Sequence, residues 1–288
     1  MTLLLQLLIN GILLGGLYAL IAQSFNLIFG VMGVVNLAHG SFIVVAGLFT
    51  YWFAIHTAVN PLFVLPVAFL AMGVAGAVVE RFLVEPLMRS ASRSDLLSLM
   101  VTFGLSYVLS ELALQSWGSD FVSLPYLQSS WTFADLAFNK ALVIAGAFAA
   151  LFSAGLYVWL NFTGSGKALL AASQSPTGAL CCGIDVGRAR LFAFALGVGL
   201  AASSGVLVII VMPLAPQSAN DFTLLAFVMI ALGGLGNYIG VAAAALALGV
   251  LQSAAGYFLG GNAEYVLPYV LLLAVMLAQP QRFRRAQT

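Results

Sequence analysis

Residues 30–42 read GVMGVVNLAHGSF and lie between two long apolar runs. The stretch holds three glycines, Asn36, and His39, which is one of only two histidines in the chain. Glycine adopts backbone angles that interrupt a helix, and the polar groups of Asn and His are costly to bury without partners. The stretch therefore predicts a helix that is interrupted inside an apolar region, with polar groups placed at the interruption.

The composition of the whole chain explains what that apolar region is. Of the 288 residues, 62% are hydrophobic and 7% are charged, and the mean hydropathy is +1.09. A soluble domain carries about 25% charged residues. The apolar runs are continuous over about twenty residues, which favours helices over the alternating strands of a barrel. We therefore predict an all-α polytopic integral membrane protein that forms a single transmembrane domain over residues 1–288.

The apolar segments place the helices along the chain. They run over residues 3–28, 31–55, 61–80, 95–116, 141–160, 190–212, 222–235, 238–259 and 264–279. Because some of these are short, we expect about eight to ten transmembrane or re-entrant helices. Two segments should contain broken helices, near 30–41 and near 232–241, because glycines cluster there beside an asparagine.

The basic residues predict the orientation of the chain. Nine of the ten Lys and Arg residues fall in three stretches, 80–95, 164–190 and 282–285. Because positive charge marks cytoplasmic loops, these stretches and the C-terminus should face the cytoplasm. The remaining loops, near 56–60, 117–140, 213–221 and 260–263, should face outward, and the aromatic stretch 117–140 should lie along the outer interface. The N-terminus should be outside if residues 31–55 cross the membrane fully, and inside if they are re-entrant.

The scarcity of charge excludes several classes of membrane protein. The chain has no series of buried Asp, Glu or His for a proton relay, and no arginine-rich helix for a voltage sensor. Two histidines cannot build an enzyme site, so no catalytic residue is predicted. The adjacent Cys181 and Cys182 lack the spacing of metal ligands, so we expect no metal. A net charge of +1 gives no reason to expect nucleic acid as a partner. What remains is a pathway protein that takes its energy from another subunit.

Residues 161–190 are the best candidate for the surface that meets that subunit. They should form a short helix over 166–174, a break at Pro176 and a second helical turn to Cys182, ended by Gly183. The stretch NFTGSGKA (161–168) is not a phosphate-binding loop, because Asn161 and Ala168 stand where that motif needs Gly and Ser or Thr. The alternative is that this loop is a plain solvated connector.

The two broken segments predict the pathway itself. A break inside the membrane frees backbone groups, and these are tolerated only where protein or a water-filled cavity satisfies them. Asn36 and His39 can either hold the broken backbone or line the path of the cargo, and both interpretations stay open. We expect the second segment to be the counterpart of the first. The candidate pathway or helix-break residues are Gly33, Asn36, His39, Gly40, Ser41, Gly233, Gly234, Gly236 and Asn237.

Three stretches carry a family resemblance that runs over nearly the whole chain in order. NGILLGGLYALIAQSFNLIFGVMGVVNLAHGSF (10–42), GKALLAASQSPTGALCCGIDVGRAR (166–190) and LGGLGNYIGVAAAALALGVLQ (232–252) resemble the inner-membrane permeases of bacterial branched-chain amino acid ABC importers. The closer likeness is to the smaller of the two permease subunits of that system. The chain departs from many relatives at Ser41, where they carry Glu, and at Leu170 and Thr177, where they carry Arg and an acidic residue.

The resemblance implies a complex in the bacterial inner membrane, surrounded by lipid. It would contain a second permease subunit, either different or identical, two ATPase subunits and a periplasmic solute-binding protein. ATP would be used by the ATPase subunits, and this chain would bind no cofactor. The loop would then contain the coupling helix that contacts an ATPase. Its candidate coupling residues are Lys167, Ala171, Ala172, Ser173, Gln174, Pro176, Ala179, Gly183, Ile184 and Asp185.

Three functions are consistent with these patterns. The first is an ABC importer permease for branched-chain or other hydrophobic amino acids, with urea, short amides or another small organic solute as alternative cargoes. The second is a stand-alone facilitator or channel, which would move its cargo without ATP or partners. The third is a purely structural membrane scaffold.

Overall fold

The computed structural model describes residues 2–33, 35–57, 59–90, 94–127, 129–133 and 136–278. The described chain consists almost entirely of helices, which confirms the predicted all-α polytopic class. Arg93 and the basic tail with Arg282, Arg284 and Arg285 lie outside the described residues, so the placement of the C-terminus stays a prediction.

The helices follow the predicted apolar segments closely. They are α1 (Thr2–Met32), α2 (His39–Thr57), α3 (Val64–Val79), α4 (Glu85–Ser90), α5 (Ser94–Trp117), α6 (Lys140–Phe162), α7 (Gly164–Gln174), α8 (Pro176–Cys181), α9 (Val186–Val211), α10 (Ala219–Gly233), α11 (Tyr238–Phe258) and α12 (Gly261–Ala278), with the single turns η1 (Pro61–Phe63), η2 (Glu80–Val84) and η3 (Pro216–Ser218). Seven helical stretches of the described chain are long and apolar enough to cross a membrane. The 15 residues of α10 span only about 22 Å, which is less than the roughly 30 Å of a bilayer core.

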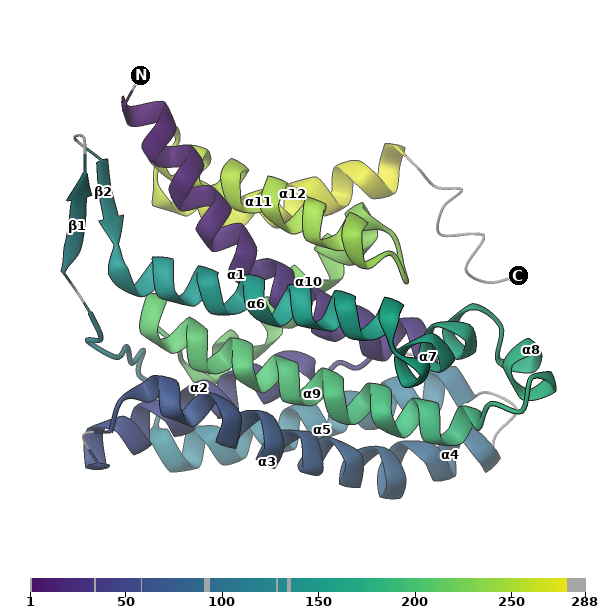
Figure 1. Ribbon diagram of the computed structural model, residues 1–288. Helices are drawn as coiled ribbons and strands as arrows, with labels where there is room; N and C mark the ends of the chain where they lie inside the picture. Colours follow the sequence, from purple (N-terminus) through teal and green to yellow (C-terminus); the bar gives the residue numbers. More distant parts are fainter. Residues whose placement is uncertain are drawn as a thin grey trace.

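A small β-hairpin marks one end of the molecule. Strands β1 (Ser130–Phe133) and β2 (Leu136–Asn139) pair antiparallel within the stretch expected to lie irregularly along the interface. Helices α7 and α8 lie at the opposite end (Figure 1). We call these the hairpin end and the α7–α8 end. The side chain of Gln6 in α1 bonds the backbone of Ala137 in β2, so α1 begins at the hairpin end.

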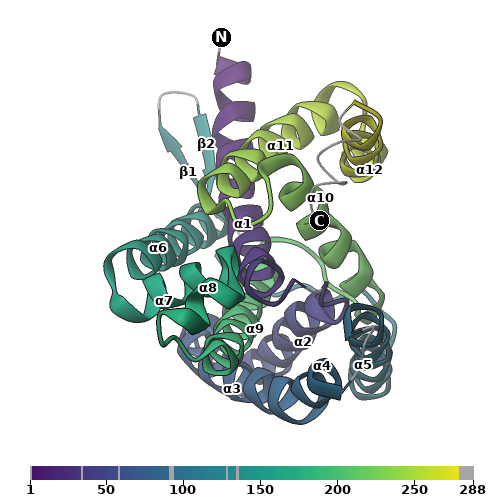
Figure 2. The ribbon, with the colours of Figure 1, turned by 90° about the vertical axis from the view of Figure 1, so that its right-hand side faces the viewer.

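Helix α9 forms the centre of the bundle. In an 18-residue apolar stretch of α9, 83% of the residues are buried. In the corresponding stretches that contain α3 and α5, 22% are buried. Viewed from the α7–α8 end, α1, α2 and α9 occupy the middle, and α3, α5, α6, α11 and α12 lie around them (Figure 2). The outer helices therefore present apolar faces to the surroundings, as expected of a protein that sits in lipid.

Two helices begin inside the bundle instead of at its surface. After α1 ends at Met32, the chain turns back before α2 begins at His39. After α9 ends, residues 212–218 return into the bundle before α10 begins at Ala219. The two helix starts abut, because a Cβ on Gly40 would lie 1.8 Å from the carbonyl oxygen of Ala219. Helices α2 and α10 therefore meet start to start and run toward opposite ends of the molecule.

This arrangement corrects the expected pairing of the two broken segments. Each half of the chain contains a long helix (α1 or α9), a short non-helical or 3-10 return, a helix that starts inside (α2 or α10) and a further long helix (α3 or α11). The return between α1 and α2 thus corresponds to residues 212–218. The interruption at 232–241 is present, but it joins α10 to α11 and so corresponds to the turn between α2 and α3. The proline-rich return 212–218 had been expected to be an outward-facing loop.

Close contacts between small residues hold the long helices together in both halves. Gly11 and Gly15 of α1 pack against Gly249 of α11, where a Cβ on Gly249 would lie 2.4 Å from the Gly11 carbonyl oxygen. In the other half, Gly199 of α9 packs against Phe69 of α3, with 2.8 Å from its Cβ position to a carbonyl oxygen. Small residues are the usual means by which membrane helices approach closely.

Gly249→Val should separate α1 from α11, because the added methyl groups would overlap the α1 backbone. Overpacking of this kind costs about 1–3 kcal/mol of folding free energy. We expect a lower thermal unfolding midpoint for the purified protein in mild detergent. Gly155→Val in α6 is the matched control, because a Cβ at Gly155 meets no atom within 4 Å. Equal midpoints for the two variants would contradict the packing role of Gly249.

Candidate translocation pathway and coupling surface

The first broken segment is closed by side chains from other helices. Its peptide groups lie inside the bundle, where each unpaired group is costly. Thr102 of α5 accepts a hydrogen bond from the Leu37 amide at 3.3 Å and lies 3.3 Å from the Val35 carbonyl. Within the segment, the Asn36 side-chain oxygen accepts from the Ala38 amide at 3.1 Å. Sequence reasoning anticipated a role for Asn36 but missed Thr102, which stands out only as a threonine inside an apolar run.

Thr223 of α10 performs the same task where α2 begins. Its hydroxyl accepts a hydrogen bond from the Gly40 amide at 2.9 Å, and it lies 3.1 Å from the Ala219 carbonyl oxygen. Beside it, the Ser41 hydroxyl of α2 lies 2.9 Å from the Ser106 hydroxyl of α5. Gly40 leaves no space for a side chain at this point. The start of α2 is therefore fixed by polar contacts to α5 and α10 together.

His39 is fully buried and reaches back to α1. Its Nε2 atom lies 3.2 Å from the Ile21 carbonyl oxygen and 3.2 Å from the Ser24 hydroxyl. Its ring packs on Phe25, with 5.0 Å between the ring centroids. The His39 side chain therefore joins α2 to the middle of α1, and the His39 backbone amide donates to the Asn36 carbonyl oxygen at 3.2 Å. Because Asn36 precedes the start of α2, the two side chains do not share a helix face.

The second broken segment is a tight glycine turn at the α7–α8 end. Gly234 and Gly236 have positive φ angles of 93° and 74°, which glycine adopts without strain. Asn237 caps α11 by accepting from the Gly240 amide at 2.9 Å. The Gly236 amide donates in turn to the side chain of Asn26 in α1 at 2.9 Å. The turn is thus attached to the end of the helix that precedes the first broken segment.

A cavity of about 390 Å³ lies between this turn and the loop expected to meet an ATPase. It is lined by Gly30, Leu170, Ser173, Gln174, Leu235, Gly236 and Asn237. The loop itself folds as predicted into two short helices, although the break falls at Ser175, and Pro176 is the first residue of α8. Gly183 ends this region with a φ of 79°, as expected of a terminating glycine. The loop and the second broken segment therefore line the same cavity.

The candidate coupling residues divide into a buried and an exposed set. Ala172 and Ala179 are buried against Val186 and Ala189, so they hold α7, α8 and α9 together and are not available to a partner. The remaining candidates are partly or fully exposed: Lys167, Ala171, Ser173, Gln174, Pro176, Gly183, Ile184 and Asp185. Sequence reasoning missed Leu180 of α8, an apolar side chain that is 60% exposed at this tip.

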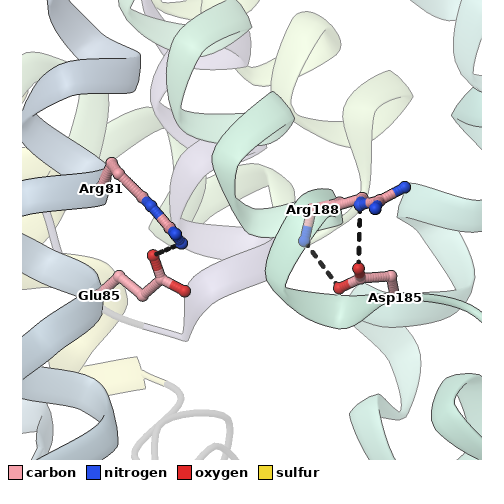
Figure 3. A network of polar contacts seen from close by, with 4 residues as sticks. All are labelled: Arg81, Glu85, Asp185 and Arg188. Atoms are coloured by element: carbon pink, nitrogen blue, oxygen red, sulfur yellow. Dashed lines mark hydrogen bonds and ion pairs between the residues drawn. The ribbon is translucent and has the colours of Figure 1, made fainter.

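The charged residues beside this tip pair locally. Asp185 caps α9 by accepting from the Arg188 amide at 3.0 Å, and its other oxygen lies 3.1 Å from the Arg188 guanidinium (Figure 3). Arg81 pairs with Glu85 across one helical turn in the neighbouring stretch. Exposed pairs of this kind contribute little stability. Asp185 therefore already forms a cap and an ion pair within its own helix.

One carboxylate, Asp221, lies in a helix and not in the outer loop that the sequence predicts. Asp221 is exposed in the first turn of α10 and accepts a hydrogen bond from the Tyr269 hydroxyl of α12 at 3.2 Å. Asp221 lies twelve residues, or about 18 Å, before the end of α10, and Tyr269 lies eight residues, or about 12 Å, after the start of α12. The pair therefore lies near the middle of a bilayer core about 30 Å thick.

The chain is similar to known proteins over most of its length. Residues 7–276 match the family described as branched-chain amino acid transport system, permease component. The chain belongs to this permease family. It is therefore a multi-pass membrane transport subunit, not an enzyme, and it works with other components of a transport system. No solved structure matches the chain. Among the described residues, no group of three His, Cys, Asp or Glu side chains could hold a metal ion.

The relatives of this permease are similar over nearly their full length. The high-affinity branched-chain amino acid transport system permease protein LivH of Salmonella typhimurium is 28% identical, with 96% of this chain and 94% of the relative aligned. The corresponding permease protein BraD of Pseudomonas aeruginosa is 26% identical over the same shares. A probable branched-chain amino acid transport permease protein LivH of Methanocaldococcus jannaschii is 26% identical, with 93% and 87% aligned.

Thr223→Val should weaken the contact between α2 and α10, because it leaves the buried Gly40 amide without its acceptor. An unsatisfied buried group costs about 1–3 kcal/mol. We expect that loss in the free energy of unfolding when the purified permease is titrated with a denaturing detergent. The isosteric exchange Thr132→Val, on the exposed hairpin, should leave the transition unchanged. A Thr223→Val variant as stable as the parent would refute the closing role of this hydroxyl.

Proposed function

We propose that this chain is a permease subunit of an ATP-binding-cassette importer for branched-chain or similar hydrophobic amino acids. The observation that carries the proposal is membership of the branched-chain amino acid permease family over residues 7–276. The similar permeases of Salmonella and Pseudomonas bear names that assign them this cargo. In this role the chain forms half of the translocation pathway, in the bacterial inner membrane, and a second permease subunit forms the other half.

The charge distribution supports an orientation for this complex. Arg81, Lys167, Arg188 and Arg190 lie toward the α7–α8 end, whereas Lys140 follows the hairpin. Because cytoplasmic segments carry the excess of basic residues, we assign the α7–α8 end to the cytoplasm and the hairpin end to the periplasm. The N-terminus then lies outside. A solute-binding protein would deliver cargo at the hairpin end.

The exposed tip of the α7–α8 loop is the surface proposed for the ATPase subunits. Leu180 and Pro176 are exposed there, and no lipid would cover them at the cytoplasmic side. Apolar side chains that are exposed outside the lipid are available for contact with another protein. Ala172 and Ala179 support this tip from beneath. ATP would be bound and hydrolysed by the ATPase subunits alone.

We further propose that His39 holds the first broken segment in place and does not touch the cargo. The support is its complete burial and its contacts with Ile21 and Ser24. Gly33, Gly40, Gly233, Gly234 and Gly236 allow the turns and close approaches of the two segments, and Asn36 and Asn237 cap them. The pathway would run beside these segments.

Leu180→Glu tests the docking surface. A carboxylate in place of an apolar side chain should weaken the contact, because the buried charge would have no partner. We expect the ATPase subunits to be lost from the complex during affinity purification of this chain, and ATP-driven leucine uptake by reconstituted vesicles to fall at least about tenfold.

The matched control is Leu259→Glu, at the hairpin end. Leu259 is 76% exposed and directly follows α11, whose C-terminal part packs on α1 near its start, away from the α7–α8 loop, so the ATPase subunits should stay bound. Replacing residues 168–182 by a Gly/Ser linker is the stronger variant and should abolish coupling. Normal assembly and uptake with that linker would show that the loop is a plain connector. Uptake by this chain alone, without ATP or partners, would show a facilitator instead.

A further inference from the structure

Asp221 carries an exposed carboxylate near the middle of the bundle. It is exposed on the surface of the single subunit, and its hydrogen bond is donated by Tyr269. Asn220 beside it is also exposed. An ionised side chain at this depth is costly in lipid, so it faces a water-filled cavity or another protein surface. Its position therefore identifies the side of α10 that is turned away from lipid.

The start of α10 gives a physical reason for a charge here. The first turn of a helix has unpaired amide groups and a partial positive charge, which stabilise a carboxylate. The helix start therefore favours a carboxylate at this position without a cationic side chain nearby. Within the described part of the chain, Asp221 accepts a hydrogen bond from the Tyr269 hydroxyl and forms no ion pair with Lys or Arg. The carboxylate thus retains acceptor positions that point out of the subunit.

We propose that Asp221 lines the transport pathway and binds the ammonium group of the amino-acid cargo during its passage. The inference rests on the proposed function, because it takes the cargo to be a zwitterion with a free ammonium group. An ammonium donates three hydrogen bonds and carries the charge that a carboxylate complements. Tyr269 orients the carboxylate from α12. The site is at the level where α2 and α10 begin, so cargo from either side of the membrane meets it midway.

Transport kinetics test the binding role. In vesicles that contain the complete importer, Asp221→Asn should lower the maximal rate of ATP-driven L-leucine uptake at least about tenfold, the factor expected for one charge-assisted hydrogen bond. The half-saturating leucine concentration should stay the same, because the solute-binding protein sets it. The control is Asp120→Asn, an exposed carboxylate near the hairpin end, which should transport normally.

The outcomes separate this inference from the proposed function. If the unmodified complex imports no leucine, the proposed function fails. If the unmodified complex imports leucine and Asp221→Asn does so at the same rate, the cargo-binding role of Asp221 is refuted. If Asp221→Asn instead separates the two permease subunits on gel filtration, the carboxylate pairs with a cation of the partner, and the inference is likewise overturned.

Thiol labelling tests the location without reference to the cargo. Cys181 and Cys182 are free and exposed, so both are first replaced by Ser. In the reconstituted complex, Asp221→Cys should react with a trimethylammonium methanethiosulfonate reagent at least about tenfold faster than Leu151→Cys, because a thiol reacts as the thiolate, which forms in water. Leu151 is 66% exposed on α6 and should face lipid. Equal, slow labelling of both positions would place Asp221 outside any aqueous path.

Discussion

The fold depends on satisfying the backbone where α2 and α10 begin inside the bundle. A helix that starts at mid-depth leaves amide groups without helical partners, and the bilayer core supplies no water to replace them. Thr223 accepts from the Gly40 amide, and Thr102 accepts from the Leu37 amide. These hydroxyls come from α10 and α5. The starts of α2 and α10 are therefore stabilised only when the whole bundle is assembled. The interruption is therefore a tertiary feature and not a local property of residues 30–42.

Close packing of the long helices fixes the positions around the starts of α2 and α10. Contacts through Gly11, Gly15 and Gly249 bring α1 against α11, and Gly199 brings α9 against α3. The two pairs hold the central helices at fixed distances, with α2 and α10 between them. Since the halves run in opposite directions, both returns end at the same depth. The result is a polar level in the middle of the bundle, with His39, Ser41, Thr223 and Asp221 near it.

Sequence patterns located the helices but not all of the polar level. Continuous hydropathy predicts the long spans, because a bilayer requires about twenty apolar residues. Glycines beside Asn36 and Asn237 predicted both interruptions. The return through 212–218 was misjudged, since a Pro-containing stretch between apolar runs resembles a surface loop. Asp221 was consequently placed outside the membrane. The hairpin was missed because its pairing depends on contacts with α1, such as Gln6 with Ala137, that no local pattern reports.

The contacts also form a continuous series from the α7–α8 loop to the middle of the bundle. Helix α7 and the turn at 234–237 line one cavity, and Gly236 in that turn is bound by Asn26 of α1. On the same helix, Ser24 and Ile21 hold His39 at the start of α2. A displacement of the loop by an ATPase would therefore act on α1 first, and through His39 on the point where α2 and α10 meet. Because packed interiors shift between discrete arrangements, we expect a small movement at the α7–α8 end to reach the level at which Asp221 lies.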